Sequence, residues 1–256
     1  RDQMNRAICI PEKIQRIVSL VPSQTELLIE LGLEDKLVGV TKFCIHPKGL
    51  KNRKTIIGGT KNFNFDKIKN LNPDLIIGNK EENYKEGIDK LASEYPVWRS
   101  DIYTIEDSMN MILSIGRITK TEVKAEKITS KIQLLLTKLN TNKIQQKKAL
   151  YFIWKNPYMV AGSNNYINEM MSLSGYSNIC NQETYSRYPE ISSKEITELN
   201  PEVVLLSSEP FPFKEKHIKE IQKLVPNALI CIVDGELYSW YGSRIIKALT
   251  HFNNTV

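Results

Sequence analysis

Apolar residues along the chain follow two different spacings. Short aliphatic runs, typical of strands that are buried on both faces, occur at residues 17–21, 75–77 and 203–206. Between such runs, apolar residues recur every three or four positions, as in residues 27–31, which is the spacing of one helix face. This alternation of strands and helices predicts an α/β fold with parallel sheets flanked by helices.

One motif occurs twice in the chain. "FDKIKNLNPDLIIGNKEE" at residues 65–82 and "SKEITELNPEVVLLSSEP" at residues 193–210 share a short helical pattern, L-N-P followed by an acid, and an aliphatic run. Proline pushes the residue before it out of helical conformation, so the helix ends there and a strand follows. One copy in each half predicts two similar lobes, each with a small parallel sheet.

The region between the two copies is helical in pattern and is not a Gly/Ser linker. Apolar residues from Val123 to Leu139 predict a long helix, and about 20 residues at ~1.5 Å each span about 30 Å. We expect an N-terminal α/β lobe at residues 1–103, a connecting helical segment at 104–147 and a C-terminal α/β lobe at 148–256. A single long backbone helix would permit only small adjustments between the lobes.

Composition and charge favour an ordinary globular protein. The chain has 256 residues, of which 41% are hydrophobic and 25% are charged, enough to bury a proper core. Its apolar runs are far shorter than the ~18 residues that cross a bilayer, so we expect no membrane span. The net charge of +6 comes from basic and acidic residues intermixed along helices, which favours a solvated surface and no nucleic-acid partner.

The cysteines Cys9, Cys44, Cys180 and Cys231 are too widely spaced for a disulfide framework in a chain of this length. Cys231 stands in the run "ALICIV", so we expect its thiol to be buried. The chain opens on Arg1 and not on Met, so we expect that any signal peptide or lipid anchor preceded it.

Three stretches resemble a known family: "RIVSLVPSQTELLIELGLEDKLVGVT" from Arg16, "GGTKNFNFDKIKNLNPDLII" from Gly58 and "YPEISSKEITELNPEVVLLS" from Tyr188. With the helix between the halves, they resemble the helical-backbone (class III) periplasmic substrate-binding proteins of ABC importers, especially members that bind cobalamin or ferric siderophores. The resemblance implies a monomeric, non-enzymatic protein without an intrinsic cofactor. Such a protein captures a large metal chelate in a cleft between its lobes and delivers it to a permease. It implies a periplasmic or cell-surface lipoprotein location, with a cytoplasmic location as the alternative.

We expect the cleft at the carboxyl ends of the strands, where open α/β sheets bind ligands. Loops at these ends are rich in aromatic side chains, which suit a large flat ligand. The residues expected to line the cleft are Pro22, Ser23, Phe43, His46, Thr60, Trp154, Tyr158, Tyr188, Glu236, Trp240, Tyr241 and Arg244. Arg244, which follows an aromatic loop, is the candidate for neutralising a ligand carboxylate or phosphate.

The resembled cobalamin binders match some of these residues and not others. They have an aromatic residue at Tyr188, an acidic one at Glu236 and an aromatic one at or next to Tyr158. Trp240 stands where that pattern has a basic residue, and Thr60 where it has an aromatic one. We therefore expect a reshaped pocket.

Cys44 and His46 are two positions apart, so in an extended segment both face the same side. They are candidates for holding a soft metal, and His46 for ligating the cobalt of a corrinoid. The alternative is that Cys44 packs and His46 caps a turn. His217 lies in the exposed-looking "KEKHIKE", so the three histidines do not predict a site for a bare zinc or manganese ion.

Two further interpretations remain open. In the resembled importers, an acid on each lobe docks onto permease arginines: Asp66 lies at that position, while the second copy has Lys194 with Glu195 one place later. A soluble chelate carrier or sensor without a permease is therefore the second candidate function. An enzyme with Cys44 as nucleophile and His46 as base is disfavoured, because adjacent i, i+2 side chains reach each other poorly.

Overall fold

The computed structural model describes residues 1–141, 146–181 and 184–255. The chain divides into two compact units. Unit 1 comprises Arg1–Ile102, Glu106–Ile132 and Tyr241–Arg244, and unit 2 comprises Tyr103–Ile105, Gln133–Trp240 and Ile245–Val256. The boundaries of these units differ from those of the three expected segments, 1–103, 104–147 and 148–256, which remain a prediction.

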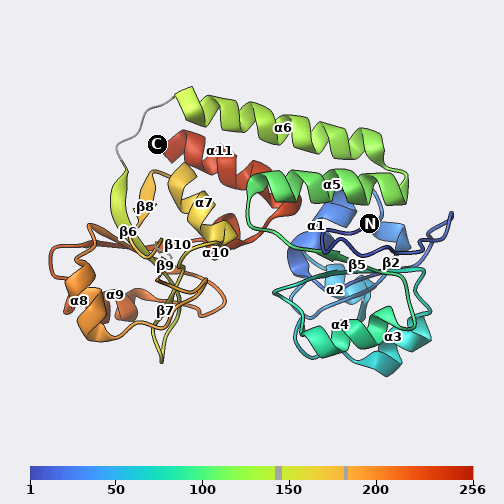
Figure 1. The fold of residues 1–256 in the computed structure, drawn as a ribbon, viewed down its shortest axis with the longest axis horizontal. Coiled ribbons are helices and arrows are strands. Elements are labelled where there is room, and N and C mark those ends of the chain that lie inside the picture. The colour runs from blue at the N-terminus through green and yellow to red at the C-terminus, as the bar shows by residue number, and fades with distance from the viewer. Residues whose placement is uncertain (142–145, 182–183, 256) are drawn as a thin grey trace. The chain divides into compact units, whose positions relative to one another are not determined.

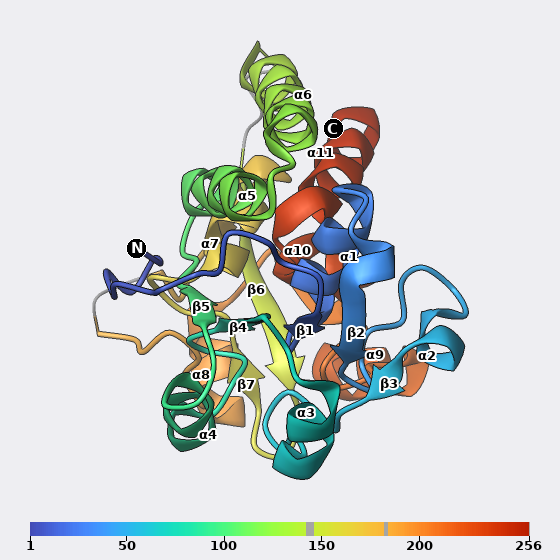
Figure 2. The ribbon, with the colours of Figure 1, turned by 90° about the vertical axis from the view of Figure 1, so that its right-hand side faces the viewer.

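Unit 1 is built on a five-stranded parallel sheet with the strand order β3-β2-β1-β4-β5. Its strands are β1 (Ile17–Ser19), β2 (Leu37–Val40), β3 (Thr55–Ile56), β4 (Leu75–Asn79) and β5 (Val97–Ser100). Figure 2 shows β1 between β2 and β4. Every residue of β1 and β4 is buried, as the continuous aliphatic runs predicted for strands covered on both faces.

Helices cover both faces of this sheet. They are α1 (Pro22–Glu30), η1 (Glu34–Lys36), α2 (Leu50–Arg53), α3 (Phe65–Leu71), α4 (Lys85–Ala92), α5 (Ile105–Thr119), the first part of α6 (Glu122–Thr141) and η2 (Gly242–Arg244). In Figure 1, α1 and α5 lie on one side of the strands, and α3 and α4 lie on the other. Trp98 of β5 is buried in the core of this unit.

Unit 2 has the predicted small parallel sheet with one added antiparallel strand, which was not predicted. Its strands are β6 (Lys147–Trp154), β7 (Met159–Val160), β8 (Tyr176–Asn178), β9 (Val203–Ser207) and β10 (Leu229–Val233). The order is β10-β9-β6-β7, with β8 also paired to β6, and β7 alone among these strands runs antiparallel. Residues 155–158 are too few for a crossover, so the chain returns beside β6 as a hairpin.

Helices also flank the second sheet. They are α7 (Tyr166–Leu173), α8 (Ser193–Leu199), α9 (Glu215–Gln222), α10 (Gly235–Ser239), α11 (Ile245–Thr255) and the second part of α6. A core that includes Leu150, Phe152, Val204 and Leu206 fills the space beneath α8 and α9. Cys231 is only half-buried, because β10 is an edge strand of the sheet, and this corrects the expected buried thiol.

The repeated motif has the same local structure in both units. Asn72 and Asn200 end α3 and α8 in left-handed conformation, with φ angles of 40° and 45°, and the proline and strand follow. The acid after each proline then binds the start of a central strand. Asp74 Oδ2 accepts the Arg16 N–H at 2.9 Å, and Glu202 Oε2 accepts the Lys148 N–H at 2.8 Å.

The connecting segment contains two helices, of which α6 (Glu122–Thr141) is the long helix predicted from Val123 to Leu139. Lys120, with a φ of 58°, separates α5 from the 20-residue α6. The division between the units falls inside α6, between Ile132 and Gln133, so this helix contributes residues to both. Among the described residues, no helix is long and apolar enough to cross a membrane.

Candidate functional site

The sequence-predicted residues of the first half lie at one edge of the unit 1 sheet. Pro22 and Ser23 follow β1, Phe43 and His46 follow β2, and Thr60 follows β3. These strands are neighbours and parallel, so their carboxyl ends and the loops after them share an edge. The topology therefore brings together loops that are up to 38 residues apart in sequence.

The side chains at this edge differ in accessibility. Pro22 and Ser23 are buried in the first turn of α1, where proline is favoured because its missing N–H has no helical partner. Phe43 is 49% exposed, and Ile45 beside it is 44% exposed. Ile45 was not among the residues predicted to line the cleft, although an isoleucine in a polar loop is a sequence feature that could have indicated it. Phe43 and Ile45 give unit 1 an exposed apolar surface at the strand ends.

Cys44 lies under this loop and not on it. Its thiol is buried, and its Sγ lies 3.1 Å from Thr25 Oγ1 and 3.3 Å from Thr41 Oγ1. Burial raises the pKa of the Cys44 thiol, so the thiolate needed by a metal ligand or nucleophile is disfavoured. The described residues contain no group of three or more His, Cys, Asp or Glu side chains placed to hold a metal. Packing, the alternative role for Cys44, fits these contacts.

Tyr241 and Arg244 belong to unit 1, although we expected them in the C-terminal lobe. Arg244 Nε donates to Glu26 Oε2 at 2.8 Å, and both side chains are 6% exposed. The Tyr241 hydroxyl donates to Glu82 Oε1 at 3.0 Å, and burial raises the pKa of this phenol well above its ordinary value. Glu26 thus compensates the Arg244 charge within unit 1, and the expected role of Arg244 with a ligand anion remains a prediction.

The sequence-predicted residues of the second half lie at the equivalent edge of the unit 2 sheet. Trp154 ends β6. Glu236 lies on α10, directly after β10, and Trp240 is the C-cap of that helix. Between them in the sheet, β9 is followed by a segment that contains Glu209 and Phe211. Neither residue was predicted, although Glu209 and Glu81 occupy matching positions in the two motif copies.

The aromatic side chains at this edge are differently placed. Trp154 is 41% exposed and packs edge-on against Phe211, with 5.6 Å between ring centroids. Tyr158 is half-buried and packs edge-on against Phe152 of the core, with 5.7 Å between ring centroids. Its ring therefore contributes to the packing of unit 2. Tyr188 is half-buried. Trp154 is therefore the exposed aromatic side chain at this edge, and the half-buried Phe211 packs against it.

Trp240 is tied to a carboxylate. It is 8% exposed, and its indole Nε1 donates to Glu209 Oε1 at 2.7 Å. Ser239 Oγ donates to the same oxygen at 2.9 Å. Burial raises the pKa of Glu209, and the nearby acids Glu236 and Asp234 raise it further.

His217 is not exposed, contrary to the sequence prediction. It is 4% exposed, its Nδ1 accepts the Lys214 N–H at 2.9 Å, and its ring lies against Phe211 and Phe213. Burial lowers the pKa of His217, which keeps the imidazole neutral. The polar pattern "KEKHIKE" gave a wrong prediction of exposure, because Phe211 and Phe213 of the preceding segment pack against His217 at the start of α9.

The two docking candidates lie in the first turns of equivalent helices. Asp66 is in α3 and is exposed. Glu195 is in α8, where it forms a capping box: its Oε2 accepts both the backbone N–H and the hydroxyl of Ser192 at 2.7 Å. Lys194 is exposed, with its Nζ 3.6 Å from Glu198. The Glu195 carboxylate thus caps the N-terminus of its own helix.

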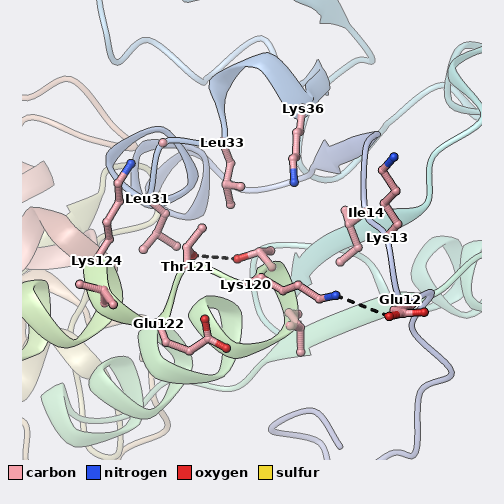
Figure 3. A pocket seen from close by; sticks show the side chains of 14 residues that line it. Glu12, Lys13, Ile14, Leu31, Leu33, Lys36, Lys120, Thr121, Glu122 and Lys124 are labelled. Carbon is pink, nitrogen blue, oxygen red and sulfur yellow. Dashed lines mark hydrogen bonds and ion pairs between the residues drawn. The ribbon is translucent and has the colours of Figure 1, made fainter.

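A cavity of about 490 Å³ lies elsewhere in unit 1 (Figure 3). Residues before β1, after α1 and at the junction of α5 and α6 line it, among them Lys13, Lys36, Lys120 and Lys124. The Nζ of Lys120 lies 3.9 Å from Glu12. None of the sequence-predicted site residues lines this cavity.

Comparisons with known proteins agree with this fold. Residues 17–228 match the family model described as periplasmic binding protein. A vitamin B12-binding protein of Vibrio parahaemolyticus is 26% identical over 77% of this chain and 72% of its own. An uncharacterized ABC transporter substrate-binding lipoprotein of Bacillus subtilis, YvrC, is 24% identical over 100% of this chain and 84% of its own. The structure of the periplasmic heme-binding protein RhuT of Roseiflexus sp. RS-1 is 19% identical, covers 94% of this chain and 97% of its own, and has a TM-score of 0.82. The chain therefore belongs to the periplasmic binding protein family, whose members bind solutes and are not enzymes.

Proposed function

We propose that this protein captures a large metal chelate, a corrinoid such as cobalamin or a ferric siderophore, and delivers it to an ABC importer. The observation that carries the proposal is the exposed aromatic surface at the carboxyl ends of both sheets. Phe43 provides it in unit 1, and Trp154, packed against the half-buried Phe211, provides it in unit 2. Wide apolar and aromatic surfaces suit ligands that are large and flat.

The ligand-binding residues follow from this placement. We propose Phe43, His46 and Thr60 in unit 1, and Trp154, Tyr158, Tyr188, Glu236 and Trp240 in unit 2. Pro22, Ser23, Tyr241 and Arg244, the other predicted ligand-binding residues, are buried within unit 1 and are proposed with less direct access to a ligand. A ligand that is the protein's cargo needs no intrinsic cofactor. The cleft between the lobes that the resemblance implied remains a prediction.

The relatives support the same class of ligand without deciding its identity. One is named for vitamin B12, one for heme, and one as a lipoprotein of an ABC transporter. We propose the same setting for this chain: a monomer outside the cytoplasm, with a permease as its partner. Asp66 is the proposed docking acid of unit 1, and Glu195 that of unit 2.

A titration followed by visible absorption tests the ligand class. Cyanocobalamin, haemin and the ferric complexes of a hydroxamate, a catecholate and citrate are each added to the purified chain. We expect a saturable spectral change with at least one of them and none with free Zn²⁺ as a calorimetric control. Saturable binding of the bare ion and of none of the chelates would refute the proposal.

A carrier or sensor without a permease is the second candidate, and one observation favours it. Lys194 stands where the resembled importers place an acid, and the Glu195 carboxylate caps its own helix. The full-length precursor sequence separates the two candidates. A signal peptide or lipobox supports delivery to an importer, and their absence from the precursor supports the carrier.

A further inference from the structure

Glu209 occupies a central place at the strand-end edge of unit 2. It follows β9, which lies between β6 and β10, so its loop lies between those that carry Trp154 and Trp240. Its backbone is fixed by Ser207, whose Oγ donates to the Glu209 carbonyl at 2.5 Å and accepts the Glu209 N–H at 3.3 Å. The carboxylate thus projects from an anchored turn.

That carboxylate holds the residues that end α10. Oε1 of Glu209 accepts the indole N–H of Trp240 at 2.7 Å and the hydroxyl of Ser239 at 2.9 Å. Trp240 is 8% exposed, so without this acceptor its N–H would lose its partner in a largely dry site. The ring of Trp240 is thereby fixed by a charge-assisted hydrogen bond.

The helix start is shaped to admit Glu209. Gly235 begins α10, and a Cβ placed there would lie 2.4 Å from Ser207 Oγ and 2.7 Å from Glu209 Cγ. The Gly235 N–H donates to Ser208 Oγ at 2.9 Å. Glycine at this position therefore allows the Glu209 loop and the start of α10 to approach closely.

The same edge carries a concentration of negative charge. Asp234 and Glu236 lie near enough to Glu209 to raise its pKa, after the larger effect of burial. Glu209 in turn raises the pKa of the Tyr151 phenol, whose burial is the main cause. A ligand carboxylate placed here meets like charges, whereas an amide or hydroxyl group finds acceptors.

We propose that Glu209 is a positioning and specificity-determining residue of the unit 2 ligand site. It fixes the indole of Trp240, and its charge favours ligand groups that donate hydrogen bonds, such as amides, over carboxylates. The proposal about specificity rests on the proposed function, whereas the fixing of Trp240 does not.

The first test reads Trp240 directly. Trp98, Trp154 and Trp240 are the three tryptophans of the chain, so a ¹H–¹⁵N spectrum shows three indole signals. The one that Trp240→Phe removes belongs to Trp240. We expect Glu209→Leu to move that signal to higher field and Glu209→Gln, which keeps an acceptor, to move it less, while the other two signals stay. A Trp240 signal unmoved by Glu209→Leu would overturn the positioning role.

The pH dependence of that signal is a second readout. It should titrate with a midpoint above the ordinary glutamate pKa of about 4.3, because burial and the neighbouring acids disfavour the carboxylate. In Glu209→Gln this titration should vanish. Its persistence in Glu209→Gln would assign it to Asp234 or Glu236 and contradict the proposal.

The specificity test uses cyanocobalamin, whose periphery carries amides, and haemin, which carries two carboxylates. We expect Glu209→Gln to strengthen haemin binding about five-fold and to change cyanocobalamin binding less than about two-fold. Glu209→Leu should weaken cyanocobalamin binding about ten-fold through Trp240. Glu198→Gln, on exposed α8 at the opposite edge of the sheet, is the charge-matched control and should change neither.

Failure of the proposed function and failure of the Glu209 proposal give different results. If wild-type protein binds neither probe nor any ferric chelate, the proposed function fails, and the indole signals alone decide the positioning role. If wild-type protein binds both probes and Glu209→Gln leaves their ratio unchanged, the specificity role is overturned while the proposed function stands.

Discussion

Arg244 and Glu26, 218 residues apart in sequence, form a buried ion pair inside unit 1, with 2.8 Å between Arg244 Nε and Glu26 Oε2. Arg244 comes from the short segment Tyr241–Arg244, which returns to unit 1 after nearly all of unit 2 has been built. The Gly242 N–H donates to Ser108 Oγ at 2.8 Å and fixes the same segment. The ion pair thus anchors a returning chain segment.

Breaking this pair should destabilise the protein strongly. Glu26→Gln leaves the buried Arg244 charge uncompensated, which costs about 3–5 kcal/mol of unfolding free energy. Urea denaturation followed by circular dichroism measures it. Arg53→Ala removes an exposed pair with Glu34 and should cost at most about 1 kcal/mol. Equal shifts for the two variants would contradict the buried pair's role.

The two copies of the motif should respond unequally to loss of their acids. Asp74 Oδ2 accepts the N–H groups of both Gln15 and Arg16, at 2.7 Å and 2.9 Å, whereas Glu202 Oε2 accepts that of Lys148. We expect Asp74→Ala to cost about 2–3 kcal/mol and Glu202→Ala about 1–2 kcal/mol, since each removes hydrogen bonds to a charged group. Thermal unfolding measures both. A larger loss for Glu202→Ala would be the contrary result.

Thiol reactivity should follow burial. Burial raises the pKa of Cys44 and raises that of Cys180 to about 12, so at neutral pH both are almost entirely protonated and unreactive. Cys9 is exposed and should be alkylated first. Mass spectrometry after brief iodoacetamide treatment gives the order. Faster labelling of Cys44 than of Cys9 would support the Cys44 nucleophile that the sequence analysis disfavoured.

Truncation of the aromatic residues should weaken ligand binding. Trp240→Ala and Tyr188→Ala are each expected to cost about 1–3 kcal/mol of affinity for the chelate that binds, the scale of a buried aromatic contact. Calorimetry on each variant measures it. Trp98→Phe, a core change away from the strand-end loops, is the control and should leave the affinity unchanged. Unaltered affinity in both alanine variants would show that the ligand binds at another site.

The sequence predicted the fold well because the relevant signals are local. The aliphatic runs became β1, β4, β9 and β10, and each L-N-P turn ended a helix at a left-handed asparagine. The hairpin of β6 and β7 was missed because β7 has only two residues, too few for any periodicity.

The candidate site was harder to predict, because burial and pairing depend on distant residues. Strand-end loops were found by their aromatic content, but Arg244 paired with Glu26 and Tyr241 with Glu82 only once the chain returned to unit 1. His217 looked solvated because its contacts, Phe211 and Phe213, precede the helix that carries it. Glu209 could be recognised in the sequence as the counterpart, in the second motif copy, of Glu81, but no sequence pattern indicates its hydrogen bond with Trp240.

Calorimetric titration of the wild-type chain with the same set of metal chelates tests the central claim most directly. The account predicts that at least one of them binds saturably, with one ligand per chain and a micromolar or tighter dissociation constant. Heat signals that stay at the level of dilution for every chelate in the set would contradict it.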